Sequence, residues 1–173
     1  AEMRAAGKRP RFVVLASDID RKMIEIARGG TYPSSALADI PEPLRRDYTI
    51  HRGAQMQVVS QLRDRVRFSM HSLVRDPPFN KVDLISCRNL LIYLDEDLQS
   101  RILPLFHYAL RPEGYLFLGP SEGVRREAAR FEELDRSARL FKRDGSPARL
   151  PLDLPLARRA AEGPKPVKAK PAP

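Results

Sequence analysis

The sequence is poor in several residue types, and each scarcity excludes a class of protein. It has one cysteine, Cys87, and no tryptophan among its 173 residues. A single cysteine excludes an internal disulfide framework and a zinc site built from cysteines. No run approaches the ~18 apolar residues of a membrane-spanning helix, and the first twelve residues lack the continuous apolar stretch of a secretory signal. We therefore expect a soluble, cytoplasmic protein.

The positive charge is concentrated at the two ends of the chain. The net charge is +9 at pH 7, and residues 145–173 hold six Lys or Arg against two acids. Seven of the sixteen prolines lie in the same stretch, which cannot bury enough apolar surface to order itself. We predict a disordered basic tail rich in Pro, Ala and Lys over residues 145–173. Such tails are more often solvated linkers than nucleic-acid contacts, so no nucleic acid is expected as a partner.

Short apolar runs alternate with helical patterns over the rest of the chain. Residues 12–16 (FVVLA) are almost wholly apolar, which predicts a strand buried on both faces. Residues 21–28 predict a helix with Asp20 as its N-cap and Gly29-Gly30 as its stop. The other predicted elements are a short helix within a loop at 31–47, a hairpin at 48–61, strands at 66–69, 82–87 and 115–118, a helix at 95–110 and a final edge strand at 138–142. This alternation predicts an α/β fold with a mostly parallel sheet.

Polar residues follow several of the predicted strands. Ligands bind beyond the carboxyl ends of the strands in open α/β sheets, so Asp18, Ser72, Arg88-Asn89 and Ser121-Glu122 are expected on one rim. Asp18 can accept hydrogen bonds from both hydroxyls of an adenosine ribose. The alternative is that Asp18 or Asp20 only caps the following helix.

The segment CRNLLIY (87–93) places an arginine, an asparagine and a tyrosine hydroxyl just past a buried strand. A binding rim needs this mixture of groups. The alternative is that Arg88 pairs with Asp83 or Asp95 and that Tyr93 packs in the core. Cys87 is interpreted as a small buried apolar residue rather than a nucleophile. The three histidines are too scattered to predict a metal site or a catalytic triad.

Five separated motifs occur in an order and spacing that resemble one family. They are ASDID (16–20), DPPF (76–79), DLISCRNLLIYL (83–94), LFHYALRPEGYLFLGPSEG (105–123) and LDRSARLFKR (134–143). With these motifs the chain is similar to the S-adenosylmethionine-binding domain of the chemotaxis-receptor glutamate O-methyltransferases of the CheR type. The motifs most resemble those of the subfamily that is fused to a receptor methylesterase domain.

The resemblance implies a fold, a cofactor and a reaction. The fold is a Rossmann-like class I methyltransferase sheet over residues 1–144, with the hairpin at 48–61 as a small β-subdomain. The cofactor is S-adenosylmethionine and the product S-adenosylhomocysteine. The implied function is protein-glutamate O-methylation in chemotaxis signal transduction, with the cytoplasmic domain of a chemoreceptor or a similar signalling protein as substrate and partner.

The resemblance also implies roles for single residues. Asp18 would bind the cofactor ribose, which favours that role over capping, and Ser72-Leu73 would lie beside the adenine. Ser72 stands where the family usually has Asn, so that hydrogen bond is weakened or made differently. Cys87, Arg88 and Asn89 match the stretch under the methionine end of the cofactor. Tyr93 matches a tyrosine that lines the transfer pocket and is the catalytic candidate; Ser121-Glu122 would border the substrate channel.

The sequence departs from the family in one respect that concerns the cofactor. No glycine-rich cofactor loop occurs in these 173 residues, and residues 1–9 resemble the end of the helix that follows this loop. The resemblance therefore predicts an incomplete sheet, whose first strand, cofactor loop, pocket arginine and N-terminal helical domain would lie upstream. It also leaves an alternative function, in which the chain is a non-catalytic remnant that acts as an interaction module. The hairpin turn holds only Gly53, which weakens the case for receptor-peptide docking there.

Overall fold

The computed structural model describes residues 7, 11–124 and 129–147, and within these it shows a mixed α/β protein. The chain divides into two compact units, Ala1–Ser72 (unit 1) and Leu73–Pro173 (unit 2). The predicted tail lies, from residue 148 onward, outside the described residues.

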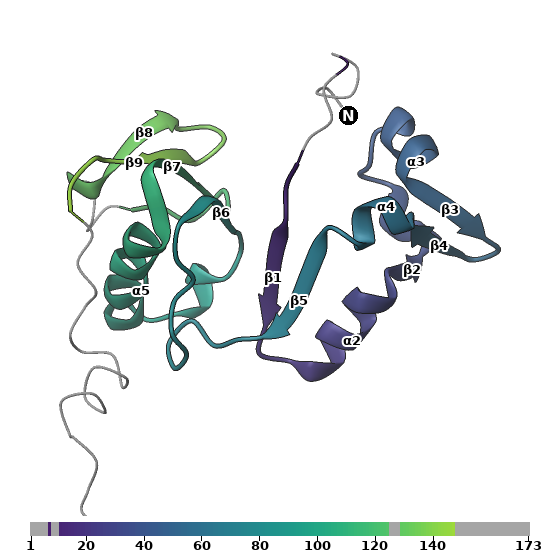
Figure 1. Cartoon of the computed structure of the whole chain (residues 1–173), viewed down its shortest axis with the longest axis horizontal. Helices are drawn as coiled ribbons and strands as arrows, with labels where there is room; N and C mark the ends of the chain where they lie inside the picture. Colours follow the sequence, from purple (N-terminus) through teal and green to yellow (C-terminus); the bar gives the residue numbers. More distant parts are fainter. Residues whose placement is uncertain (1–6, 8–10, 125–128, 148–173) are drawn as a thin grey trace, which may run out of the picture. The chain divides into compact units, whose positions relative to one another are not determined.

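Unit 1 begins with a β-α-β arrangement. Strand β1 (Val14–Asp18) pairs in parallel with β5 (Val66–Met70), and helix α2 (Arg21–Gly29) lies against them (Figure 1). The Asp20 carboxylate accepts the Lys22 backbone N–H at 2.7 Å and caps the helix. At the other end, Gly30 adopts a left-handed conformation (φ 61°), which glycine enters without steric cost. The predicted strand, cap, helix and glycine stop are confirmed.

The burial predicted for the first strand is wrong. Val14 is 43 % exposed and Leu15 is 48 % exposed, although both are large apolar residues. Within the described part of the chain, β5 is the only strand that pairs with β1, and α2 is too short to cover it. The apolar run therefore identified a strand correctly but did not determine how many of its faces are covered.

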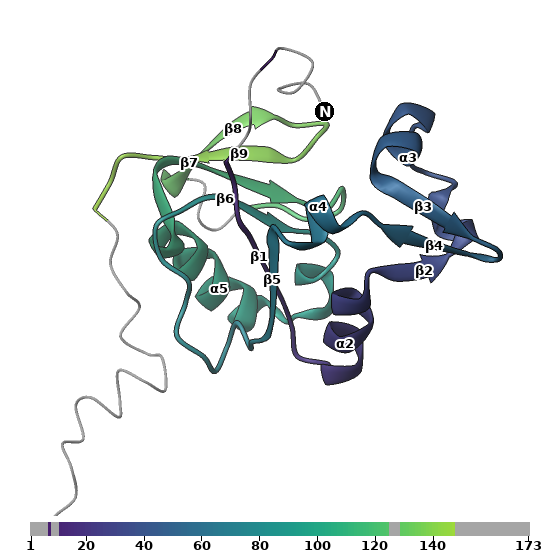
Figure 2. The ribbon, with the colours of Figure 1, turned by 45° about the vertical axis from the view of Figure 1, so that its right-hand side comes forward.

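The rest of unit 1 is a small antiparallel sheet with short helices. Strand β4 (Gln55–Val58) lies between β2 (Thr31–Pro33) and β3 (Thr49–Arg52), as Figure 2 shows. The hairpin β3–β4 is the predicted one, and its turn residue Gly53 has φ 62°. The third strand, β2, was not predicted, because three residues are too few to show an alternating pattern. The short helices are η1 (Ser34–Leu37), α3 (Glu42–Tyr48) and α4 (Ser60–Arg63).

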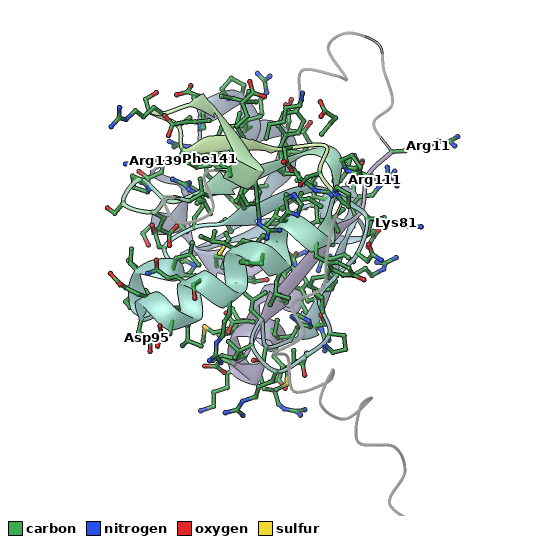
Figure 3. All side chains as sticks on the ribbon, turned by 90° about the vertical axis from the view of Figure 1, so that its left-hand side faces the viewer. Arg11, Lys81, Asp95, Arg111, Arg139 and Phe141 are labelled. Carbon is green, nitrogen blue, oxygen red and sulfur yellow. The ribbon has the colours of Figure 1, made fainter. Side chains whose placement is uncertain are left out.

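Unit 2 packs one helix on a four-stranded sheet of order β6-β7-β9-β8. Its elements are β6 (Val82–Cys87), η2 (Leu91–Tyr93), α5 (Glu96–Ala109), β7 (Leu110–Leu118), β8 (Phe131–Asp135) and β9 (Leu140–Arg143). The β6–β7 pair is parallel, whereas β7–β9 and β9–β8 are antiparallel. Asp95 caps α5 by accepting the Leu98 N–H at 2.8 Å, and it marks one end of the helix in Figure 3.

Two expectations for this sheet need correction. The strand predicted at 138–142 is β9, and it is not an edge strand because it pairs with β7 on one side and β8 on the other. The edge strand on that side of the sheet is β8, whose sequence FEELD contains only one buried residue, Phe131. The sheet is also less parallel than predicted, because the chain returns through antiparallel strands after β7.

The core of unit 2 is a continuous apolar cluster between α5 and the sheet. The helix contributes Ile102, Leu103 and Phe106. The sheet contributes Leu116 and Leu118 from β7 and Phe141 from β9, the last of which is labelled in Figure 3. This cluster supports the end of β6, where the predicted site residues begin.

Candidate functional site

Asp18 and Ser72 lie at the same edge of the parallel pair in unit 1. Asp18 is the last residue of β1 and is in register with Met70, the last residue of β5. The His71 backbone N–H donates to the Asp18 carbonyl oxygen at 3.0 Å, so the segment that follows β5 starts beside Asp18. The predicted adjacency of these two strand ends within unit 1 is confirmed.

The side chain of Asp18 is exposed and does not cap the helix. One of its oxygens accepts the Asp20 backbone N–H at 2.9 Å, while Asp20 itself caps α2. The capping alternative therefore holds for Asp20 and not for Asp18. An exposed carboxylate at a strand end accepts hydrogen bonds from hydroxyl groups, which is the chemistry that a ribose needs.

In unit 2 the residues after β6 form a fixed turn. Cys87, at the end of β6, is in register with Leu118, at the end of β7. Asn89 has φ 58°, in the left-handed region that non-glycine residues seldom adopt. The Glu122 carboxylate accepts hydrogen bonds from the backbone of this turn. The strand ends β6 and β7 thus meet at one edge, as predicted within this unit.

Arg88 does not form the ion pairs that the alternative interpretation required. Asp83 accepts from Arg111 at 2.9 Å, and Asp95 caps α5. The Arg88 guanidinium instead lies over the Phe117 ring, 4.8 Å from its centroid. This cation–π contact orients the side chain.

Tyr93 is not a core residue. Its side chain is 79 % exposed, and its neighbour Leu91 is the one that is buried. The alternative that placed Tyr93 in the core is therefore wrong, and the Tyr93 hydroxyl is accessible.

Leu73, the first residue of unit 2, packs against the apolar cluster, so at least part of its side chain has a structural role.

Cys87 is buried, as predicted. Burial raises the pKa of the Cys87 thiol to about 12, and the negative charge of Glu122 adds to this effect. A thiol with so high a pKa holds almost no thiolate at neutral pH, and the thiolate is the nucleophilic form. Any contribution of Cys87 to a binding site is therefore one of packing.

Two polar features of unit 2 were missed by sequence reasoning. Glu122 is only 5 % exposed, although it was expected to border a channel. His107 is fully buried, and its Nε2 lies 2.8 Å from Asp144 Oδ1, while Arg143 donates to the Leu110 carbonyl oxygen at 2.9 Å. Neither feature has a local sequence signal, because most of the partners are 31 to 37 residues apart.

In the described ranges, no three His, Cys, Asp or Glu residues are grouped so that they would hold a metal ion. Across the same residues, no helix has the length and apolar character needed to cross a bilayer.

Comparison with known sequences identifies the family. Residues 1–140 match the family described as CheR methyltransferase, SAM binding domain. The chain belongs to this family. Its cofactor is therefore S-adenosylmethionine, and the resemblance carried by the five motifs is confirmed.

Relatives of the CheR domain in three bacteria are similar to this chain. An uncharacterized 104.1 kDa protein of Rhodobacter capsulatus is 36 % identical over 79 % of the chain and 14 % of its own length. Chemotaxis protein methyltransferase 2 of Pseudomonas aeruginosa is 35 % identical over 65 % of the chain and 42 % of its own length. A protein of Rhizobium etli described as a probable chemotaxis protein methyltransferase is 38 % identical over 68 % of the chain and 46 % of its own length. The chain thus spans less than half the length of these relatives.

The residues of the CheR domain present here fit S-adenosylmethionine in their chemistry. Unit 1 offers the Asp18 carboxylate for ribose hydroxyls, together with Ser72. Unit 2 offers exposed Arg88, Asn89 and Tyr93 at the end of β6, above a buried Cys87. The meeting of these two groups of residues on one rim stays a prediction.

Proposed function

We propose that the protein containing this domain transfers methyl groups from S-adenosylmethionine to glutamate carboxylates of a chemoreceptor or a similar signalling protein in the cytoplasm. The observation that carries the proposal is the family match over residues 1–140, which includes every predicted site residue. The chemotaxis methyltransferases among its relatives support the same substrate class. The proposed fold is the Rossmann-like sheet of class I methyltransferases, with the hairpin β3–β4 as part of a small β-subdomain.

The proposed domain boundaries follow from the same argument. Residues 1–144 form the methyltransferase part, and residues 145–173 form a basic, proline-rich tail outside it. The family match ends at residue 140, close to the end of β9 at Arg143. The composition of the tail supports its disorder, since seven of its residues are proline and none is aromatic.

The proposed chemistry requires little from the protein beyond binding and orientation. When bound, S-adenosylmethionine supplies an electrophilic methyl group on its sulfonium. A glutamate carboxylate with its ordinary pKa of about 4.3 is already ionised at neutral pH, so no general base is needed. The tasks left to the protein are in-line positioning of the carboxylate and exclusion of water.

The proposed residue roles follow from what each side chain offers. The Asp18 carboxylate accepts hydrogen bonds from the ribose hydroxyls, and Ser72-Leu73 lie along the adenine. Arg88 and Asn89 bind polar groups at the methionine end, over the apolar surface of Cys87. The Tyr93 hydroxyl orients the reacting carboxylate, since it is exposed and is not needed by the core.

The test is methyl transfer by the full-length protein to the purified cytoplasmic domain of a chemoreceptor. Radiolabelled S-adenosylmethionine should label the receptor, and mild base should release the label as methanol, because carboxyl methyl esters hydrolyse whereas N-methyl groups do not. A receptor in which the accepting glutamates are changed to glutamine is the control and should not be labelled. Cofactor binding without transfer to any receptor tested would instead support the interaction module. Because the 173 residues lack the glycine-rich loop, the isolated chain should bind the cofactor more weakly than the full-length protein.

A further inference from the structure

Glu122 accepts four backbone hydrogen bonds with its two carboxylate oxygens. Oε2 accepts from Asn89 N at 3.0 Å and from Gly119 N at 2.6 Å. Oε1 accepts from Leu90 N at 2.8 Å and from Leu91 N at 2.7 Å. Three of the donors are the consecutive residues 89–91, which start two positions after the end of β6. Hydrogen bonds to an ionised acceptor are about twice as strong as neutral ones, so this carboxylate fixes three successive peptide groups at once.

The turn held by Glu122 contains a residue in the left-handed region. Asn89 has φ 58°, a conformation that asparagine adopts at lower cost than most other residues with a Cβ. Gly119 lies directly against it. A Cβ at position 119 would lie 2.6 Å from Glu122 Oε2, 2.7 Å from Asn89 Oδ1 and 2.9 Å from Asn89 N. The close approach of Gly119 and the hydrogen bond to the Glu122 carboxylate therefore both restrain the backbone of residue 89.

The segment fixed in this way carries the exposed polar residues of unit 2. Leu91 is 2 % exposed and anchors the segment in the apolar cluster. The Gln99 side chain donates to the Leu91 and Leu94 carbonyl oxygens at 2.9 and 3.0 Å, which ties the far end to α5. Arg88, Asn89 and Tyr93 stay exposed on this support. Their positions thus depend on hydrogen bonds made by a residue that lies 29 to 34 positions later in the chain.

We propose that Glu122 is a positioning residue for cofactor binding, which acts by fixing the backbone of residues 89–91 and not by touching cofactor or substrate. The inference rests on the proposed function, because it concerns the same strand end. It replaces the expectation that Glu122 borders the substrate channel, since the buried carboxylate points its oxygens at backbone N–H groups.

The first variant is Glu122→Gln in the full-length protein. An amide has one accepting oxygen, and its NH₂ group would face two of the four N–H donors whichever way it is turned. Loss of bonds to a charged acceptor should weaken binding of S-adenosylmethionine by about tenfold or more. The second variant, Gly119→Ala, keeps the carboxylate and displaces the turn by steric contact, so it should weaken binding in the same direction. Both affinities are measured by calorimetry and expressed per folded molecule.

Cys87 gives a second readout that does not require the cofactor. It is the only cysteine of the 173 residues and is 8 % exposed at the start of the turn, so its alkylation rate in the 173-residue chain reports opening of this segment. Both variants should be alkylated faster than the wild type. Gly119→Ala distinguishes opening of the turn from an effect of charge on the thiol. It retains the negative charge of Glu122, which contributes to the raised pKa of Cys87.

Two control variants complete the experiment. Glu133→Gln removes an exposed carboxylate on β8 and should change neither affinity nor alkylation. Phe141→Leu weakens the same apolar cluster without touching the turn, so it should lower the unfolding temperature but leave the affinity per folded molecule unchanged. Wild-type affinity and wild-type alkylation in both Glu122→Gln and Gly119→Ala would overturn the inference. If the wild-type protein binds no cofactor, the proposed function fails, while faster alkylation of the variants would still support Glu122 as the residue that holds the turn.

Discussion

Unit 2 buries eleven residues in one apolar cluster, whereas in unit 1 the buried apolar residues are Ile24, Leu37 and Met56. The cluster of unit 2 joins a 14-residue helix to all four strands of its sheet. Unit 1 distributes its apolar residues over two small sheets, and Phe12, Val14 and Leu15 stay exposed.

The difference affects how each unit presents its site residues. In unit 2 the turn after β6 packs on the apolar cluster through Leu91, and its backbone is hydrogen-bonded to the buried Glu122 carboxylate. These contacts fix the backbone that carries the exposed side chains. In unit 1 Asp18 ends a strand that has one paired neighbour among the described residues. We therefore expect substitutions in the core of unit 2 to act on stability and substitutions at the strand end of unit 1 to act on binding.

The largest expected effect is on the core of unit 2. Phe141 is 2 % exposed at the centre of the cluster, and Phe141→Ala should lower the free energy of unfolding by about 3–5 kcal/mol. Urea denaturation followed by circular dichroism measures this. Leu15→Ala in unit 1 is the matched comparison and should cost much less, because that side chain is 48 % exposed. Equal losses in the two variants would contradict the contrast between the units.

The next effect concerns the two neighbouring acids of unit 1. Asp18→Ala in the full-length protein should weaken binding of S-adenosylmethionine by roughly 1–3 kcal/mol, since it leaves polar groups in the site unpaired. Asp20→Ala should instead cost about 0.5–2 kcal/mol of stability through loss of the helix cap. Calorimetric titration and thermal unfolding of both variants separate the two roles. Unchanged cofactor affinity in folded Asp18→Ala would remove that residue from the site.

Tyr93 tests whether an exposed residue of unit 2 acts in catalysis. Tyr93→Phe should lower turnover by roughly tenfold, or about 1.4 kcal/mol, with a smaller change in cofactor affinity, if the hydroxyl acts mainly on the transition state. Its thermal stability should stay close to that of the wild type, since 79 % of the side chain is exposed. Loss of stability with normal turnover per folded molecule would contradict a role in the transfer pocket.

The smallest expected effect is a pH dependence in unit 2. Hydrogen bonds from His107 and Ser146 hold the pKa of Asp144 below its ordinary value. A carboxyl whose pKa is lower in the folded than in the unfolded chain stabilises the fold above its unfolded pKa of about 3.9, and this contribution is lost as the pH falls through the folded value. Asp144→Asn should therefore be less stable than wild type at neutral pH, by on the order of 1 kcal/mol. The difference should shrink below about pH 4. A difference that is constant from pH 7 to pH 3 would contradict this assignment.

Local sequence signals predicted most elements because their causes are local. Asp20 and Gly30 bound α2, four of the six residues of β6 are apolar, and the hairpin at 48–61 has its glycine turn. Strands β2 and β8 were missed because one is very short and the other is mostly charged. The interior position of β9 depends on pairing with residues more than twenty positions earlier, which no local pattern contains.

The candidate site also has some features that local sequence predicts and others that depend on distant residues. Asp18, Arg88, Asn89 and Tyr93 were found because each follows a predictable strand in a motif of the family. The support of the site could not be found, since the bonds of Glu122 to Asn89, Leu90 and Leu91 appear only when β6 and β7 are side by side. Burial was also misjudged for β1, because the hydrophobicity of a strand does not specify what covers it.

The interior position of β9 has a consequence for the order of synthesis. The apolar cluster needs Phe141, and Arg143 ties the end of β9 to the end of α5, yet these residues are made after every other strand of the sheet. Until the ribosome has released them, β7 has a free edge beside an unfilled core, and such edges are prone to intermolecular pairing. A premature stop only a few codons before residue 140 should therefore yield insoluble product, although it would spare every residue assigned to the site.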